Sequence, residues 1–169
     1  MFDACVLGVD PGLARVGLAV VAGRDRTAEL RWATTVRTPA GAPEAGRLRQ
    51  VAEAVRAAIA EHRPDAVSIE RVAWNRNQVS ALHVARATGV VMVVAAEAGL
   101  PVEEYGPNEV KVAVTGAGNA GKREVQSALV RLHGLRGVPA QPDAADAVAV
   151  ALTHLLGARV RSLSRLGAR

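Results

Sequence analysis

The chain has 169 residues, enough for one domain with a substantial core, and half of them are hydrophobic. Its lone cysteine, Cys5, excludes an internal disulfide and fits a reducing compartment, while an aromatic content of only 2% leaves the core to valine, leucine and alanine. Lysine and arginine number 21 against 16 aspartate and glutamate, and this modest basic excess is compatible with nucleic acid or another anionic partner.

The first seventy residues predict strands on both sides of one helix. Apolar, β-prone runs at 4–10 and 16–22 are joined by PGLAR and form a hairpin, and 29–38 alternates well enough to be a third strand. Residues 42–64 space their apolar side chains as an amphipathic helix does, and the helix should stop before Pro64. A short buried strand is expected next, at 65–70.

The rest of the chain alternates helix and strand. Residues 77–99 predict a long helix, whose most apolar part, 89–99, is too short to cross a bilayer. The elements expected after it are a strand at 101–105 and helices at 107–114, 122–133 and 142–157. Three leading strands followed by this alternation indicate an α/β fold: a five-stranded mixed β-sheet flanked by helices on both faces.

The two ends of the chain suggest a cytoplasmic protein with a basic tail. No basic-then-apolar leader with a small-residue cleavage site opens the sequence. Residues 158–169 carry four arginines and no acid. We expect one domain over 1–157, followed by a flexible tail over 158–169 that could make a weak nucleic-acid contact.

Two aspartates open the last predicted helix. Pro142 suits the first helical position, and the helix macrodipole favours Asp143 beside it. Asp146 lies about a turn further in, where apolar residues follow on every side and a carboxylate needs a partner. Residues three apart on a helix are neighbours, so both acids can share a cation. Helix capping is the simpler alternative for this stretch.

Two further acids stand at the ends of predicted strands. Asp10 ends the first strand and Glu70 the fourth, and open α/β sheets place their sites beyond the carboxyl ends of strands. If these strands are neighbours, four carboxylates converge and require divalent metal, with oxygen ligands favouring Mg²⁺ or Mn²⁺. Each acid has a structural alternative, a turn at VDPG or an ion pair between Glu70 and Arg71, but these do not explain all four together.

Four blocks of the sequence resemble the RuvC-type Holliday-junction resolvases. They are VLGVDPGLARVGLAVV at 6–21, SIERV at 68–72, YGPNEVKVAVTGAGNAGKREV at 105–125 and PDAADAVAVALTH at 142–154. The resemblance implies an RNase H-like fold and a homodimer that nicks two opposed strands of a four-way DNA junction during recombination and repair. It also implies two Mg²⁺ or Mn²⁺ ions per active site and, as partners, the branch-migration proteins RuvA and RuvB. Its acids fall on Asp10, Glu70, Asp143 and Asp146, the same four.

The only two lysines lie in one segment. By resemblance, Lys111 and Lys122 stand near the active site and help catalysis, and the alternative is two solvated surface lysines. GAGNAGKR at 116–123 looks like a P-loop, but Arg123 replaces the magnesium-binding hydroxyl and a helix precedes it. We therefore expect Lys122 to meet a DNA phosphate beside backbone N–H groups exposed around Asn119, with Lys111 and Arg123 as further DNA contacts.

The segment RVAWNRNQ at 71–78 has the composition of a stacking platform for unpaired bases. The family usually carries a phenylalanine at the position of Ala73, where it inserts into the junction, and this chain departs there. Trp74 is the candidate substitute, and buried packing is its alternative role. The DNA contacts expected from this segment are Arg71, Trp74, Arg76 and Asn77.

The long helix at 77–99 is too apolar to be covered by one sheet alone, and in the family its equivalent joins two subunits. A two-fold axis suits a substrate with two related strands. Three rival functions remain open. They are an actin-fold kinase, which would need a second domain, a junction-binding module without catalysis, and an RNase H-like nuclease with another nucleic-acid substrate.

Overall fold

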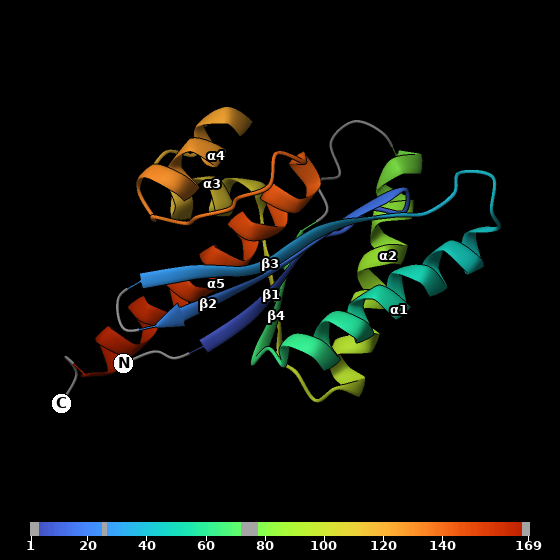
Figure 1. Cartoon of the computed structure of the whole chain (residues 1–169), viewed down its shortest axis with the longest axis horizontal. Helices are drawn as coiled ribbons and strands as arrows, with labels where there is room; N and C mark the ends of the chain where they lie inside the picture. The colour runs from blue at the N-terminus through green and yellow to red at the C-terminus, as the bar shows by residue number, and fades with distance from the viewer. Residues whose placement is uncertain (1–3, 25–26, 72–77, 167–169) are drawn as a thin grey trace.

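The computed structural model describes residues 4–24, 27–71 and 78–166 (Figure 1). Its centre is one five-stranded sheet of order β3-β2-β1-β4-β5. The first three strands form an antiparallel meander, and β4 and β5 continue the sheet parallel to β1, so the sheet is mixed as expected. The strands are β1 (Ala4–Asp10), β2 (Arg15–Arg24), β3 (Thr27–Arg37), β4 (Ala66–Glu70) and β5 (Val102–Tyr105).

Helices cover both faces of this sheet, which confirms the predicted layers (Figure 1). The helices are α1 (Glu44–His62), α2 (Gln78–Glu97), α3 (Pro107–Thr115), α4 (Lys122–Arg131) and α5 (Pro142–Leu166). Leu7 and Val9 of β1 point to the α1 and α2 side, whereas Val6 packs with α3, α4 and α5. The alternation of side chains along a strand therefore divides the core into two halves.

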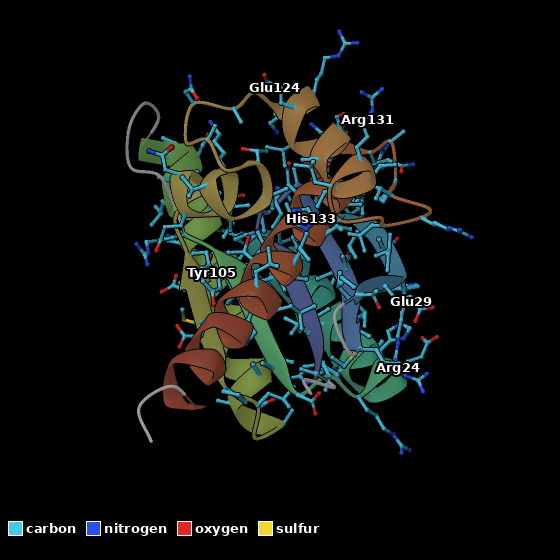
Figure 2. The ribbon with its side chains drawn as sticks, turned by 90° about the vertical axis from the view of Figure 1, so that its left-hand side faces the viewer. Arg24, Glu29, Tyr105, Glu124, Arg131 and His133 are labelled. Atoms are coloured by element: carbon cyan, nitrogen blue, oxygen red, sulfur yellow. The ribbon has the colours of Figure 1, made fainter. Side chains whose placement is uncertain are left out.

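Helix α5 lies directly on the sheet, crossing in front of the strands in Figure 2. Two glycines make this approach possible. A Cβ on Gly8 would stand 2.1 Å from the carbonyl oxygen of Ala147, and one on Gly17 would stand 1.9 Å from that of Asp143. The absence of side chains at these two positions brings the first turns of α5 against β1 and β2.

The last helix is longer than predicted. It continues to Leu166 instead of ending at 157, so the first part of the basic segment prolongs α5. Its arginines, serines and leucines tolerate helix, and Gly157 alone costs only about 1 kcal/mol relative to alanine. The flexibility of the tail and the domain boundary at 157 stay predictions.

Helix α2 has an unusual surface. By length and composition its stretch Val79–Glu97 could cross a membrane, and a third of it is buried here. The prediction that this helix is too short to cross a bilayer considered only residues 89–99, whereas the apolar stretch is longer. Large apolar side chains remain exposed along α2: Val79 is 66% exposed, Leu82 47% and Val93 57%.

Candidate active site

Asp10 and Glu70 lie at the carboxyl ends of two neighbouring strands of the sheet. Strands β1 and β4 are parallel neighbours in which Val9 pairs with Ile69, so the residues that follow stand side by side. This confirms that the first and fourth strands are adjacent. On the far side of Glu70, β5 contributes Tyr105 in register, and the chain then turns into α3.

The first turns of α5 bring in the third carboxylate. Asp146, Asp10 and Glu70 line one cavity of about 290 Å³, whose remaining walls come from α3, α4 and α5. Lys111, half-buried on α3, and Lys122, the first residue of α4, line the same cavity. The only two lysines of the chain therefore face three of its acids.

Asp143 stands slightly apart from the other acids. Its carboxylate lies 3.8 Å from the guanidinium of Arg15, at the start of β2, and it borders a neighbouring cavity that also reaches Asp10. It is still close enough to raise the pKa of Asp10. Arg15 was not singled out from the sequence, although it follows VDPG closely.

The acids destabilise one another's charged forms. Burial and then the charges of Glu70, Asp146 and Asp143 raise the pKa of Asp10 to about 8, against the lowering effect of Lys122. Burial and the charge of Asp146 likewise raise the pKa of Glu70, while a hydrogen bond from Asp10 and the two lysines act in the opposite direction. Buried like charges of this kind are relieved by a bound cation, which would restore the ionised forms.

Lys122 partly compensates this negative charge. Its Nζ lies 2.9 Å from Oδ2 of Asp146, and that contact raises the pKa of the lysine. The Glu124 carboxylate accepts a 2.6 Å hydrogen bond from the Gly121 N–H at the start of α4. This contact holds the first turn of α4 in place and therefore sets the position of Lys122, its first residue.

The donor chemistry fits a divalent metal, but the side chains are not arranged as ligands here. Within residues 4–24, 27–71 and 78–166, no group of three or more His, Cys, Asp or Glu side chains is positioned to hold a metal ion. Lys122 supplies the positive charge beside Asp146, and Arg15 supplies it beside Asp143. All four candidate groups are carboxylates, the donor type that hard cations select.

Comparison with known proteins identifies the family. A family model described as crossover junction endodeoxyribonuclease RuvC matches residues 6–154. The chain belongs to the RuvC family. A Frankia alni protein named crossover junction endodeoxyribonuclease RuvC is 49% identical over 164 residues, which cover 96% of this chain and 82% of the relative.

Solved structures agree with this assignment. Thermus thermophilus RuvC in complex with a Holliday-junction substrate has a TM-score of 0.87 and 38% identity, over 93% of this chain and 96% of that one. The yeast mitochondrial resolvase Ydc2, 12% identical with a TM-score of 0.65, shares the fold. This RuvC protein therefore has the RNase H-like fold and is a crossover junction endodeoxyribonuclease, and RuvC nucleases depend on divalent metal.

The other expected DNA contacts of this RuvC chain are placed only in part. Arg71 is exposed and pairs with Glu109 at 3.7 Å rather than with Glu70. Asn119 and Arg123 are exposed on either side of Lys122. Ala73, Trp74, Arg76 and Asn77 lie outside the described residues, so the stacking platform stays a prediction.

Proposed function

We propose that this RuvC protein cuts four-way DNA junctions as a homodimer, hydrolysing one phosphodiester bond in each of two opposed strands. The observation that carries the proposal is the shared cavity of Asp10, Glu70 and Asp146 with both lysines. Two carboxylates, Asp10 and Glu70, whose pKa values are raised by burial and by neighbouring negative charge beside the only two lysines of the chain, are typical of a site completed by metal and phosphate.

The acids of the site would bind metal ions, and the lysines would contact the phosphate. Asp10, Glu70 and Asp146 would hold two Mg²⁺ or Mn²⁺ ions, with Asp143 completing the set from the side of Arg15. Bound there, such ions would supply the chemistry of activating a water and stabilising the departing 3′-oxygen. Lys111 and Lys122 neutralise charge on the phosphate, since ammonium groups lining a carboxylate cavity attract that anion.

The homodimer is supported by the exposed apolar side of α2. Val79, Leu82 and Val93 lie on one helix and would be buried by a second copy of the chain. A two-fold axis there would relate two active sites, as a junction with two equivalent strands requires. Association with RuvA and RuvB and a cytoplasmic location are further parts of this proposal.

Cleavage of an end-labelled immobile four-way junction, beside a matched linear duplex, tests the function. Wild type should make paired, symmetric nicks in the junction alone with Mg²⁺ or Mn²⁺, and none with EDTA. Asp143→Asn should bind but not cut, whereas Glu53→Gln, an exposed carboxylate of α1, should cut normally. Tight binding without cutting in either metal would favour a binding module, and equal cutting of the duplex would favour a nuclease for other substrates.

A further inference from the structure

A second cavity, of about 420 Å³, borders the active site on the other side of Asp10. The loop after β1 forms its floor, and α1, α2 and the start of α5 supply its walls. Asp10 lines both cavities, so the two adjoin at this carboxylate. Asp143 also lines this cavity, but the metal and lysine chemistry proposed above leaves its α1 and α2 side unused.

Three basic side chains line the second cavity: Arg15, Arg47 and His83. Arg47 donates from Nε to the Thr38 hydroxyl at 2.9 Å, and no carboxylate in the described part of the chain forms an ion pair with it. Its terminal guanidinium nitrogens are therefore available for an anion. Arg15 offsets the charge of Asp143 and is 62% exposed, so it can also turn toward a ligand.

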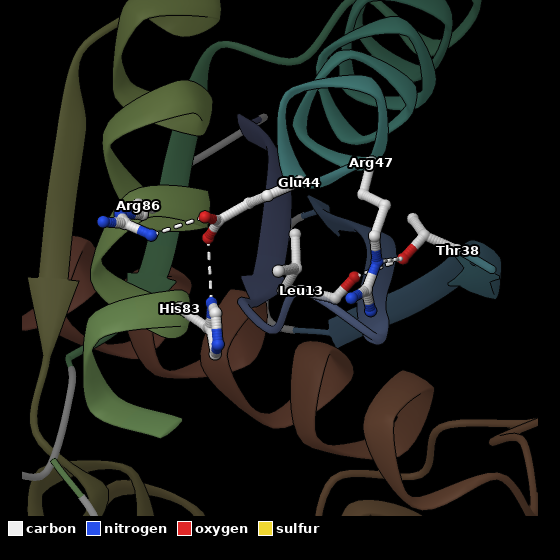
Figure 3. Close-up of polar contacts among 6 residues, drawn as sticks. All are labelled: Leu13, Thr38, Glu44, Arg47, His83 and Arg86. Atoms are coloured by element: carbon white, nitrogen blue, oxygen red, sulfur yellow. Dashed lines mark hydrogen bonds and ion pairs between the residues drawn. The ribbon is translucent and has the colours of Figure 1, made fainter. Parts of the chain in front are cut away.

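The basic groups are held in place by neighbouring polar residues (Figure 3). Glu44 at the start of α1 contacts both His83 and Arg86 of α2, and its pKa is lowered by those hydrogen bonds. The Glu44 to His83 contact is 2.8 Å at Nδ1, which orients the imidazole.

Thr38 connects Arg47 to the loop that follows Asp10. The threonine is buried, its hydroxyl donates to the carbonyl of Leu13, and its N–H donates to that of Ala14 at 3.1 Å. Arg47 of α1 is therefore held, through Thr38, against the loop that follows Asp10 (Figure 3). Little ordering of the arginine is left to occur when an anion binds.

We infer that this cavity binds the DNA phosphate next to the scissile one on the cleaved strand, with Arg47 as its main contact. The inference rests on the proposed function, because it needs the scissile phosphate to lie beside Asp10, Glu70 and Asp146. Contacts to the backbone set the register of a nucleic acid, and a guanidinium binds phosphate in a bidentate manner. Two adjoining cavities, one metal-binding and one basic, accept consecutive phosphates of one strand.

A methylphosphonate scan tests the inference, because this replacement removes the charge of one phosphate at a time. Binding is measured in the Asp146→Asn background, where no strand is cut, for every phosphate around the junction core. At the phosphate adjoining the mapped wild-type nick, the replacement should weaken binding about tenfold. Adding Arg47→Gln should weaken the unmodified junction about tenfold and cancel the effect of the replacement at that one position.

Three variants test whether Arg47 contacts the phosphate directly or only supports the surrounding structure. Arg47→Lys should recover part of the affinity, and Arg49→Gln, an exposed arginine on the same helix outside the cavity, should change nothing. Thr38→Val removes the side-chain hydrogen bonds but keeps the Arg47 charge, so the phosphate effect should persist. Arg47→Gln should also reduce the salt dependence of binding by about one phosphate contact.

The inference would be overturned if the methylphosphonate scan of Arg47→Gln matched the scan of the protein that keeps Arg47. It would also be overturned if Arg47→Gln weakened binding equally at every phosphate and Thr38→Val had the same effect. Failure of the proposed function has a different signature. In that case wild type would leave the unmodified junction intact with both metals, whereas an Arg47-dependent phosphate in the scan would still support anion binding in this cavity.

Discussion

At the scale of single residues, Asp10 is the carboxylate whose ionised form is most clearly disfavoured by burial and by the neighbouring acids. Its pKa of about 8, against an ordinary 3.8, means that the metal-free folded protein binds this proton more tightly than the unfolded chain does. The stabilisation is complete below pH about 4 and is lost as the pH rises toward 8. A charged Asp10 therefore lowers the stability of the metal-free fold at neutral and alkaline pH.

Asp10→Asn should abolish cleavage and stabilise the metal-free protein at alkaline pH. Because the amide carries no charge, the variant should melt about 5 °C above wild type at pH 9 in EDTA, with a smaller difference at pH 5. Thermal melts at the two pH values measure this, and Glu53→Gln is the control. Parallel pH profiles for wild type and variant would contradict the assigned charge repulsion.

Lys122→Gln should separate catalysis from folding. The ammonium is exposed, with 73% of its side chain accessible, so its ion pair with Asp146 contributes at most about 1 kcal/mol to stability. Loss of charge beside the phosphate should reduce single-turnover cleavage roughly 100-fold. Arg131→Gln, at the other end of α4, is the matched control. Cleavage at the wild-type rate would remove Lys122 from the site.

At the scale of elements, the position of α5 depends on two residues without side chains. A methyl group at Gly17 would collide with the Asp143 carbonyl, and one at Gly8 with that of Ala147. The contacts are to backbone, which cannot turn aside as a flexible side chain can. The helix that carries two of the four acids is therefore placed by strands β1 and β2.

Gly17→Ala should displace the start of α5 and with it Asp143 and Asp146. We expect a loss of roughly 1–3 kcal/mol of stability and a fall in cleavage that persists where the variant is fully folded. Gly46→Ala, in α1 with open space around it, should be neutral or slightly stabilising. Urea denaturation and single-turnover cleavage measure both effects, and wild-type values for Gly17→Ala would show that α5 does not need this approach.

At the scale of the whole molecule, the proposed dimer decides whether two cuts are coupled. Leu82→Glu with Val93→Glu places two charges on the exposed apolar side of α2 and should leave a folded monomer. Sedimentation at micromolar concentration should show a dimer for wild type and a monomer for the variant, which nicks one strand at most. Val130→Glu, equally exposed on α4, is the control. A monomeric wild type would contradict the proposal.

Local pattern alone determined the elements of this protein. Apolar β-prone runs in β1 and β2, helical spacing in α1 and Pro142 at the start of α5 are short-range preferences, so strands and helices could be predicted within a few residues. The far end of α5 could not, because Gly157 stands at the predicted end and the helix continues through it to Leu166. The four acids could be singled out because two end strands and two open a helix, and their role as metal ligands stays a prediction.

Only the tertiary structure decided which of these groups meet. It showed that Asp143 pairs with Arg15, that both lysines face the other three acids, and that Arg47 and His83 enclose a second cavity. These residues come from segments far apart in the chain, and no local preference relates them. Their proximity follows from β1 pairing with both β2 and β4 and from α5 lying on glycines, which are long-range contacts that packing alone determines.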